Sequence, residues 1–61
     1  MANLTEKELF SLTDQLDCEK MLSSKYSAAT QECQDTALKT MFQGLASQHK
    51  QNYDCLLKHL Q

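Results

Sequence analysis

The sequence has no proline and one glycine, Gly44, in 61 residues. Because the tight turns of β-rich domains need such residues, this composition argues against a β-rich fold and favours helices. There is no block of basic residues and the net charge is −2, so the phosphate neutralisation that drives nucleic-acid binding is not expected. The mean hydropathy is −0.56 and no apolar run approaches the roughly 20 residues of a membrane span. Residues 1–6 contain neither a basic nor an apolar segment, which predicts no signal peptide and an intracellular location.

The length allows one domain, residues 1–61, and a domain of this length can form only a small hydrophobic core. A chain of this size buries only about 60% of its unfolded surface, and disulfides, metals or oligomerisation usually compensate. The cysteines are three in number, at Cys18, Cys33 and Cys55, with spacings that match no zinc or redox motif. A disulfide framework is therefore not expected, and oligomerisation is the remaining means of stabilisation.

The first predicted helix covers residues from about 5 to 32. Thr5 and Glu8 have the spacing of a capping box, in which each side chain accepts a hydrogen bond from the backbone amide of the other residue. The apolar stripe that follows consists of Leu9, Leu12, Leu16, Leu22, Tyr26, Ala29 and Cys33.

The second predicted helix covers residues from about 36 to 59, after a turn at about 33–35. Its stripe consists of Leu38, Met41, Phe42, Leu45, Ala46, Tyr53, Leu56 and Leu60. In one continuous helix the two stripes would lie more than about 100° apart and neither would be buried well. Asp35 is a suitable N-cap for a second helix, so the sequence predicts a break before it.

The predicted fold is an all-α, antiparallel two-helix hairpin. A turn at about residue 34 brings Leu12 beside Leu56, Leu22 beside Ala46 and Leu9 beside Leu60, and it also pairs Tyr26 with Phe42. Two helices alone cannot enclose two such broad stripes. We therefore expect a two-fold homodimer that forms a four-helix bundle.

Glu19 and His49 interrupt the two apolar stripes near the middle of each predicted helix. The hairpin register places them at the same level, and an antiparallel dimer would bring two copies of each into one layer. They could form a buried hydrogen-bonded pair, or they could bind a metal in the manner of helical-bundle metal sites. The helical di-iron pattern needs a further carboxylate at the position where this chain has Ala46. We therefore expect no bound metal. If a metal were bound, Glu19 and His49 would be the candidate ligands.

Cys55 and His59 lie one turn apart, and two copies could form a Cys2His2 zinc site across a dimer. The simpler interpretation is an unliganded thiol and a solvated histidine near the end of a helix, where a positive charge is favoured. The sequence contains no nucleophile–base–orienter set and no glycine-rich phosphate loop. We therefore expect no catalytic residues, no cofactor and no enzymatic activity.

Several segments resemble the Coat F family of bacterial spore coat proteins. They are Leu4-Thr5-Glu6-Lys7-Glu8-Leu9 at the start of a helix, Glu19-Lys20, Ser24-Lys25-Tyr26, Glu32-Cys33 before the turn, and Gln43 through Tyr53. The resemblance covers nearly the whole chain. It implies a ferritin-like helical bundle in which Glu19 and His49 match positions that hold ligands in ferritin-like relatives. Ala46 and Gln48 stand where acids are often found, and Asp35-Thr36 replaces the usual Asn-Pro turn.

The resemblance implies a structural or assembly protein of the spore coat type, located in the spore coat or the mother-cell cytoplasm. Its expected partners are a second copy of the chain and other coat proteins, with neither nucleic acid nor membrane. Two alternatives remain open at this stage. One is a degenerate ferritin-like metal-binding protein, and the other is an adaptor that binds an amphipathic helix of another protein.

Overall fold

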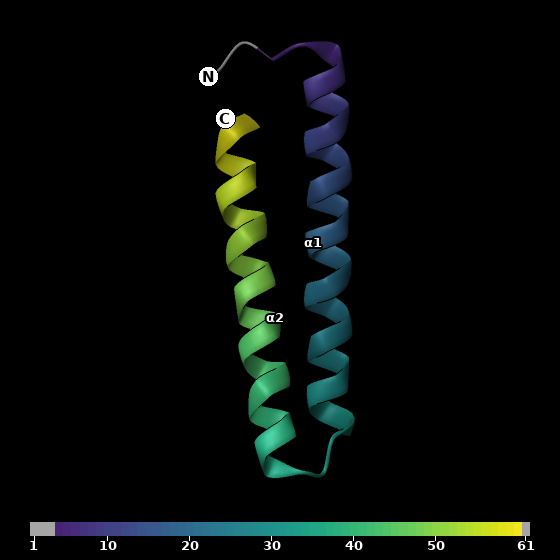
Figure 1. The fold of residues 1–61 in the computed structure, drawn as a ribbon, viewed down its shortest axis with the longest axis vertical. Helices are drawn as coiled ribbons and strands as arrows, with labels where there is room; N and C mark the ends of the chain where they lie inside the picture. Colours follow the sequence, from purple (N-terminus) through teal and green to yellow (C-terminus); the bar gives the residue numbers. More distant parts are fainter. Residues whose placement is uncertain (1–3, 61) are drawn as a thin grey trace.

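Two long antiparallel helices make up the described part of the chain (Figure 1). The computed structural model describes residues 4–60, so the signal-peptide prediction, where it concerns residues 1–3, lies outside them. Helix α1 spans Glu6–Glu32 and helix α2 spans Thr36–Leu57, followed by a 3-10 turn, η1, at Lys58–Leu60. The helices pack against each other along a rod of 46 × 15 × 11 Å. The predicted all-helical hairpin is confirmed, and its second helix ends two residues earlier than expected, in η1.

Helix α1 begins with the capping box that the sequence predicts. The Thr5 hydroxyl accepts from the Glu8 amide at 3.1 Å, and the Glu8 carboxylate accepts from the Thr5 amide at the same distance. Glu6 and Glu8 also place negative charge in the first turn, where the helix dipole favours it. The Thr5 amide lowers the pKa of Glu8 below its usual value of 4.5, with a smaller contribution from the Thr5 hydroxyl, because both stabilise the ionised carboxylate.

The turn between the helices needs no glycine, because its ends are extended. Cys33 and Asp35 have ψ angles of 133° and 122° and negative φ angles that any residue adopts. The Cys33 amide donates to the Ala29 carbonyl at 2.9 Å, which closes the last turn of α1. Asp35 then caps α2 by accepting from the Leu38 amide at 2.8 Å. Local hydrogen bonds at both helix ends therefore fix the break at residues 33–35.

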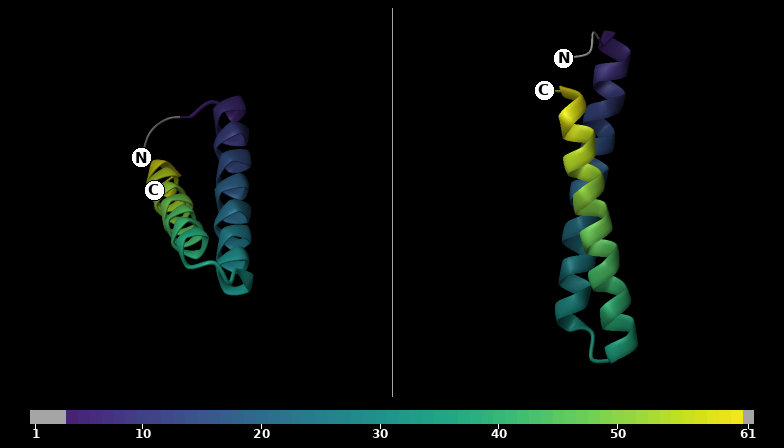
Figure 2. Two further views of the ribbon diagram at one scale, coloured as in Figure 1. Left: turned by 60° about the horizontal axis from the view of Figure 1, so that its bottom comes forward. Right: turned by 90° about the vertical axis from the view of Figure 1, so that its left-hand side faces the viewer.

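The contact between the helices follows a heptad pattern. Buried or half-buried positions recur at alternating intervals of four and three residues. They are Leu12, Leu16, Glu19, Ser23, Tyr26 and Thr30 in α1, and Phe42, Ala46, His49, Tyr53 and Leu56 in α2, with Leu60 in η1. This spacing is typical of helices that cross at a small angle, which Figure 2 shows from two sides.

Very little of this contact is fully buried. Among residues 4–60 the buried residues are Leu16, Glu19 and Thr30, of which only Leu16 is apolar. The Thr30 hydroxyl is satisfied by donating to the Tyr26 carbonyl at 2.8 Å. The hairpin therefore has a line of contact rather than an enclosed core.

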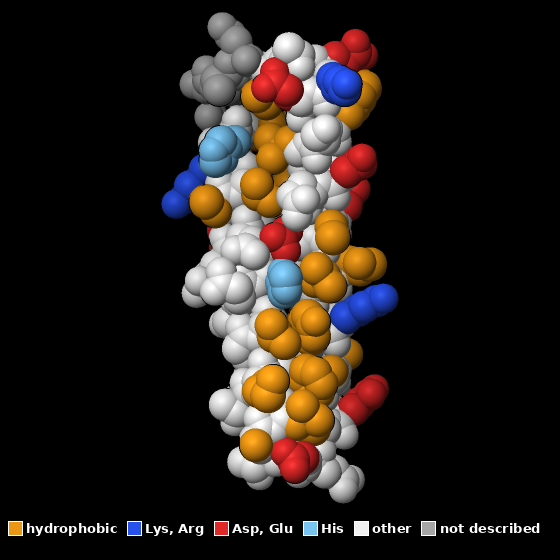
Figure 3. Space-filling model, in the orientation of Figure 1, with side chains coloured by type: hydrophobic (Ala, Val, Ile, Leu, Met, Phe, Trp, Pro, Cys, Tyr) orange, Lys and Arg blue, Asp and Glu red, His pale blue; other side chains and the backbone are white. Residues whose placement is uncertain are grey.

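The two sides of this line differ in chemistry. One side is lined by small and polar residues of both helices, such as Ser27, Gln43 and Lys50. On the other side, Figure 3 shows apolar side chains spread over both helices in the half next to the turn. Leu38, Met41 and Leu45, which are exposed, lie in the half of α2 next to the turn, and their spacing puts them on one flank of that helix.

Candidate functional site

Glu19 and His49 meet at the middle of the hairpin. His49 Nδ1 lies 2.6 Å from Glu19 Oε1, and the two side chains are 21% and 8% exposed. Both residues occupy heptad contact positions, so each side chain is directed at the facing helix. The prediction that they share a level and form a pair is confirmed.

Tyr26 extends this pair into a small cluster with two aromatic contacts. Its ring stacks on the His49 imidazole, with centroids 5.7 Å apart and planes inclined by 9°. It also stacks on Phe42 at 6.0 Å and 27°, the pair that the hairpin register predicts. Tyr26 follows Glu19 by seven residues, about two helical turns, so both lie on the same face of α1. The sequence analysis did not predict the stacking of Tyr26 on His49. It could have been inferred from the spacing, because Phe42 and His49 lie seven residues apart on the contact stripe of α2 and Tyr26 lies on that of α1.

The pair satisfies the hydrogen-bonding needs of both groups. A carboxylate as buried as that of Glu19 requires a partner, and His49 supplies one across the helix contact. With Nδ1 bound to the carboxylate, the other ring nitrogen, Nε2, is the one left for a further contact. Carboxylate–histidine pairs of this kind orient the ring in many metal sites. Within residues 4–60, however, no group of three or more His, Cys, Asp or Glu residues is placed to hold a metal ion.

In the second candidate pair, Cys55 and His59, the thiol and the imidazole do not contact each other. His59 Nδ1 faces the Cys55 backbone oxygen at 3.2 Å, rather than the Cys55 thiol. All three cysteines are free thiols, with Cys18 and Cys55 exposed and Cys33 half-buried. The Cys33 thiol donates to the Asp35 carbonyl at 3.5 Å, so it takes part in the turn.

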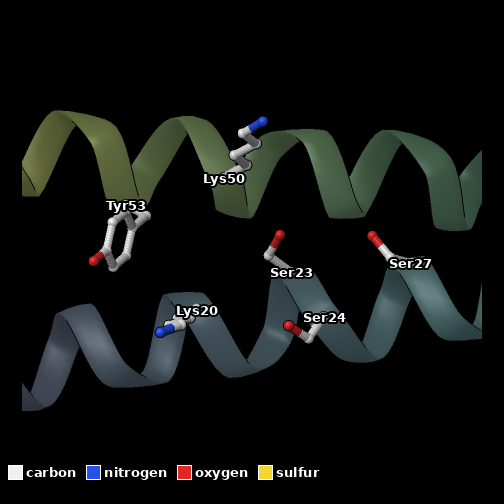
Figure 4. A pocket seen from close by; sticks show the side chains of 6 residues that line it. All are labelled: Lys20, Ser23, Ser24, Ser27, Lys50 and Tyr53. Carbon is white, nitrogen blue, oxygen red and sulfur yellow. The ribbon is translucent and has the colours of Figure 1, made fainter.

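An open hollow lies between the helices on their polar side. Its volume is about 340 Å³, and it is lined by Lys20, Ser23, Ser24, Ser27, Lys50 and Tyr53 (Figure 4). The sequence interpretation did not identify it, because serines carry no apolar periodicity. Its lining contains no histidine or carboxylate that could activate a serine hydroxyl as a nucleophile. The hollow therefore offers hydroxyl and ammonium groups from both helices.

No protein-family model, curated protein or solved structure matches this chain. Over residues 4–60, no helix combines the length and apolar character needed to cross a bilayer. The fold therefore defines a helical hairpin with a partly buried Glu–His pair and an exposed apolar patch.

Proposed function

We propose that this protein is a non-enzymatic structural or assembly protein that acts as a homodimer, two hairpins forming a ferritin-like four-helix bundle. The observation that supports it most directly is the burial pattern. Leu16 is the one buried apolar residue among residues 4–60, whereas Leu38, Met41 and Leu45 are exposed. Such a surface is typical of a protein that is completed by association.

The surface area supports the same conclusion. A compact monomer of 7.0 kDa is expected to expose about 4,000 Å². This chain exposes 4818 Å². The excess, about 800 Å², is close to the area that each partner buries in a protein–protein interface of standard size. A second hairpin is therefore an economical way to cover it.

On the basis of the resemblance to the Coat F family, we propose that this assembly is located in the spore coat or the mother-cell cytoplasm. Other coat proteins would then be further partners. Phe10 and Met21 are the residues best placed to contact them. Both are exposed, and eleven residues, about three helical turns, separate them on the outer side of α1. They would remain accessible after the patch around Leu38, Met41 and Leu45 is covered.

Light scattering coupled to gel filtration tests the dimer. We expect a mass of twice 7.0 kDa, and helicity that falls on dilution because association and folding are linked. Met41→Asp should shift the protein to monomers or unfold it. Phe10→Asp is the matched control, because Phe10 is 61% exposed and Met41 62%, but Phe10 lies outside the patch. A fully helical monomer at low concentration would contradict the proposal.

The same experiment addresses the adaptor alternative. The exposed flank formed by Leu38, Met41 and Leu45 has the i, i+3, i+7 spacing that could receive an amphipathic helix of another protein. An adaptor would be monomeric and partly unfolded alone, and would gain helicity only with its partner. The metal-binding alternative is tested on the same preparation by metal analysis after purification without chelators.

A further inference from the structure

Two heptad stripes beside the helix contact, one in each helix, change from apolar to polar residues at the level of the Glu19–His49 pair. Along one heptad stripe of α1, Leu22 and Ala29 follow Glu8 and Gln15. Along the matching stripe of α2 and η1, Leu38 and Leu45 precede Asn52 and His59. In both helices the apolar members lie on the turn side of the pair. We define the turn-side face by Leu22, Ala29, Leu38, Met41 and Leu45.

The other half of the same two stripes is suited to water. The side-chain oxygen of half-buried Asn52 accepts a hydrogen bond from the side-chain amide of exposed Gln48 at 3.0 Å. His59 is exposed beside the Cys55 carbonyl, and Gln15 is exposed on α1. Covering these groups with apolar side chains would remove their hydration without replacing it.

We infer that the second copy covers only the turn-side face, so that the two hairpins associate antiparallel and offset. This inference rests on the homodimer proposed above. It places the two-fold axis at the level of the Tyr26–Phe42 stack, in the turn half, and not at the Glu19–His49 layer. The apolar half of each copy then lies on the apolar half of the other, and the halves that carry the chain ends project in opposite directions.

The two other symmetric arrangements match the surface less well. A fully overlapping antiparallel dimer would place Leu38 and Leu45 of each copy against the polar half of the other. A parallel dimer would also bring the two polar halves together, and it would bury Gln15 and Asn52 along with the apolar residues. Only the offset dimer covers the apolar face while leaving the amide and imidazole groups in water.

The shape of the dimer in solution provides one test. Each hairpin is 46 Å long. If the two overlap over the turn half, about 20 Å of helix at ~1.5 Å per residue, the dimer would span about 70 Å. Full overlap in either direction would give about the length of one hairpin. Small-angle X-ray scattering should therefore show a maximum dimension larger by about 20 Å than that of a fully overlapping dimer.

Cross-linking through single cysteines provides the second test. Cys55 and Met41 lie on one stripe of α2, two heptads apart, and both are exposed. One variant carries Cys18→Ser and Cys33→Ser and keeps Cys55. The other also carries Cys55→Ser, together with Met41→Cys. A flexible bis-maleimide should convert the Met41→Cys protein to covalent dimers and leave the Cys55 protein monomeric on a denaturing gel, because Cys55 lies about 18 Å of helix further from the axis than residue 41 does.

The outcomes separate the three arrangements. Self-linking of both variants would indicate a parallel dimer and overturn the inference. Cross-linking only in a mixture of the two variants, with a short maximum dimension, would indicate full antiparallel overlap and would also overturn it. In both cases the homodimer itself would stand. A monomer by light scattering would instead remove the proposed function together with the inference.

Discussion

Glu19 and His49, thirty residues apart in the chain, are joined by a 2.6 Å contact between a buried carboxylate and an imidazole. The pair occupies the middle of the helix contact, where apolar residues would otherwise be expected. Each residue provides the hydrogen-bonding partner that the other needs in this position.

Removing either member of the pair should destabilise the protein more than removing both. In Glu19→Leu or His49→Leu, the remaining polar group is left in the contact without its partner, at a cost of about 1–3 kcal/mol. The double variant should restore an apolar layer, so that the two effects are non-additive by at least about 1 kcal/mol. Urea unfolding at fixed protein concentration measures this coupling. Additive effects would show that the contact contributes nothing to stability.

A chelator separates the structural pair from a metal site. If Glu19 and His49 stabilise the protein only through each other, the unfolding transition should be the same with and without the chelator. If a metal were bound, its removal would lower the stability of the wild type.

Gly44→Ala should stabilise the protein. Gly44 lies inside α2 at a negative φ, and a Cβ added there meets no heavy atom within 4 Å. Alanine should therefore gain about 0.5–1 kcal/mol through the smaller entropy loss of the chain on folding. For a domain of this size, 1 kcal/mol corresponds to about 4–8 °C in the thermal midpoint. The reverse change at an exposed position of α1, Ala28→Gly, serves as the control and should lower the midpoint by a similar amount.

Insertion of two glycines between Gln34 and Asp35 should be tolerated. The insertion lengthens the turn but keeps Asp35 as the N-cap of α2, and doubling a loop costs only about 0.6 kcal/mol. The same insertion after Gln43 should cost several times more, since it adds about 1 kcal/mol per glycine and also shifts the register of the helix contact. Thermal unfolding of both variants, followed by circular dichroism, measures the difference. Equal losses would contradict the turn at 33–35.

The capping box should make the start of α1 sensitive to acid. The pKa of Glu8 is lowered below 4.5 by the Thr5 amide and hydroxyl, so folding is favoured by its ionised form. The resulting stabilisation is present above pH 4.5 and is lost as the pH falls through the lower, folded-state pKa. The stability of wild type should therefore decrease towards that of Glu8→Gln below pH 4.5, whereas at neutral pH the variant is the less stable one. Urea titrations of the two proteins at several pH values measure the difference in their stability.

Glu6→Gln, which changes a charge in the same turn without touching Thr5, should retain the acid dependence that comes from Glu8. A gap between wild type and Glu8→Gln that does not change with pH would exclude this contribution.

The sequence alone determined the features that depend on near neighbours in the chain. The bonds between Thr5 and Glu8 and between Asp35 and Leu38 each span three residues, so spacing was enough to predict where both helices begin. The level of Glu19 relative to His49 was also predictable, because a helix advances by a fixed rise and the turn is short. The helix type, the turn and the central pair were all obtained in this way.

Only the tertiary structure decided how far each helix is rotated towards the other. Periodicity gives the angles between side chains on one helix, but it does not fix which flank of α1 lies beside which flank of α2. For this reason Leu38 belonged to an apolar stripe and is nevertheless exposed, whereas Thr30 was outside the stripes and is buried. The contact of Tyr26 with His49, the serine-lined hollow and the turn-side face all result from that rotation, because each is formed by residues of both helices at once.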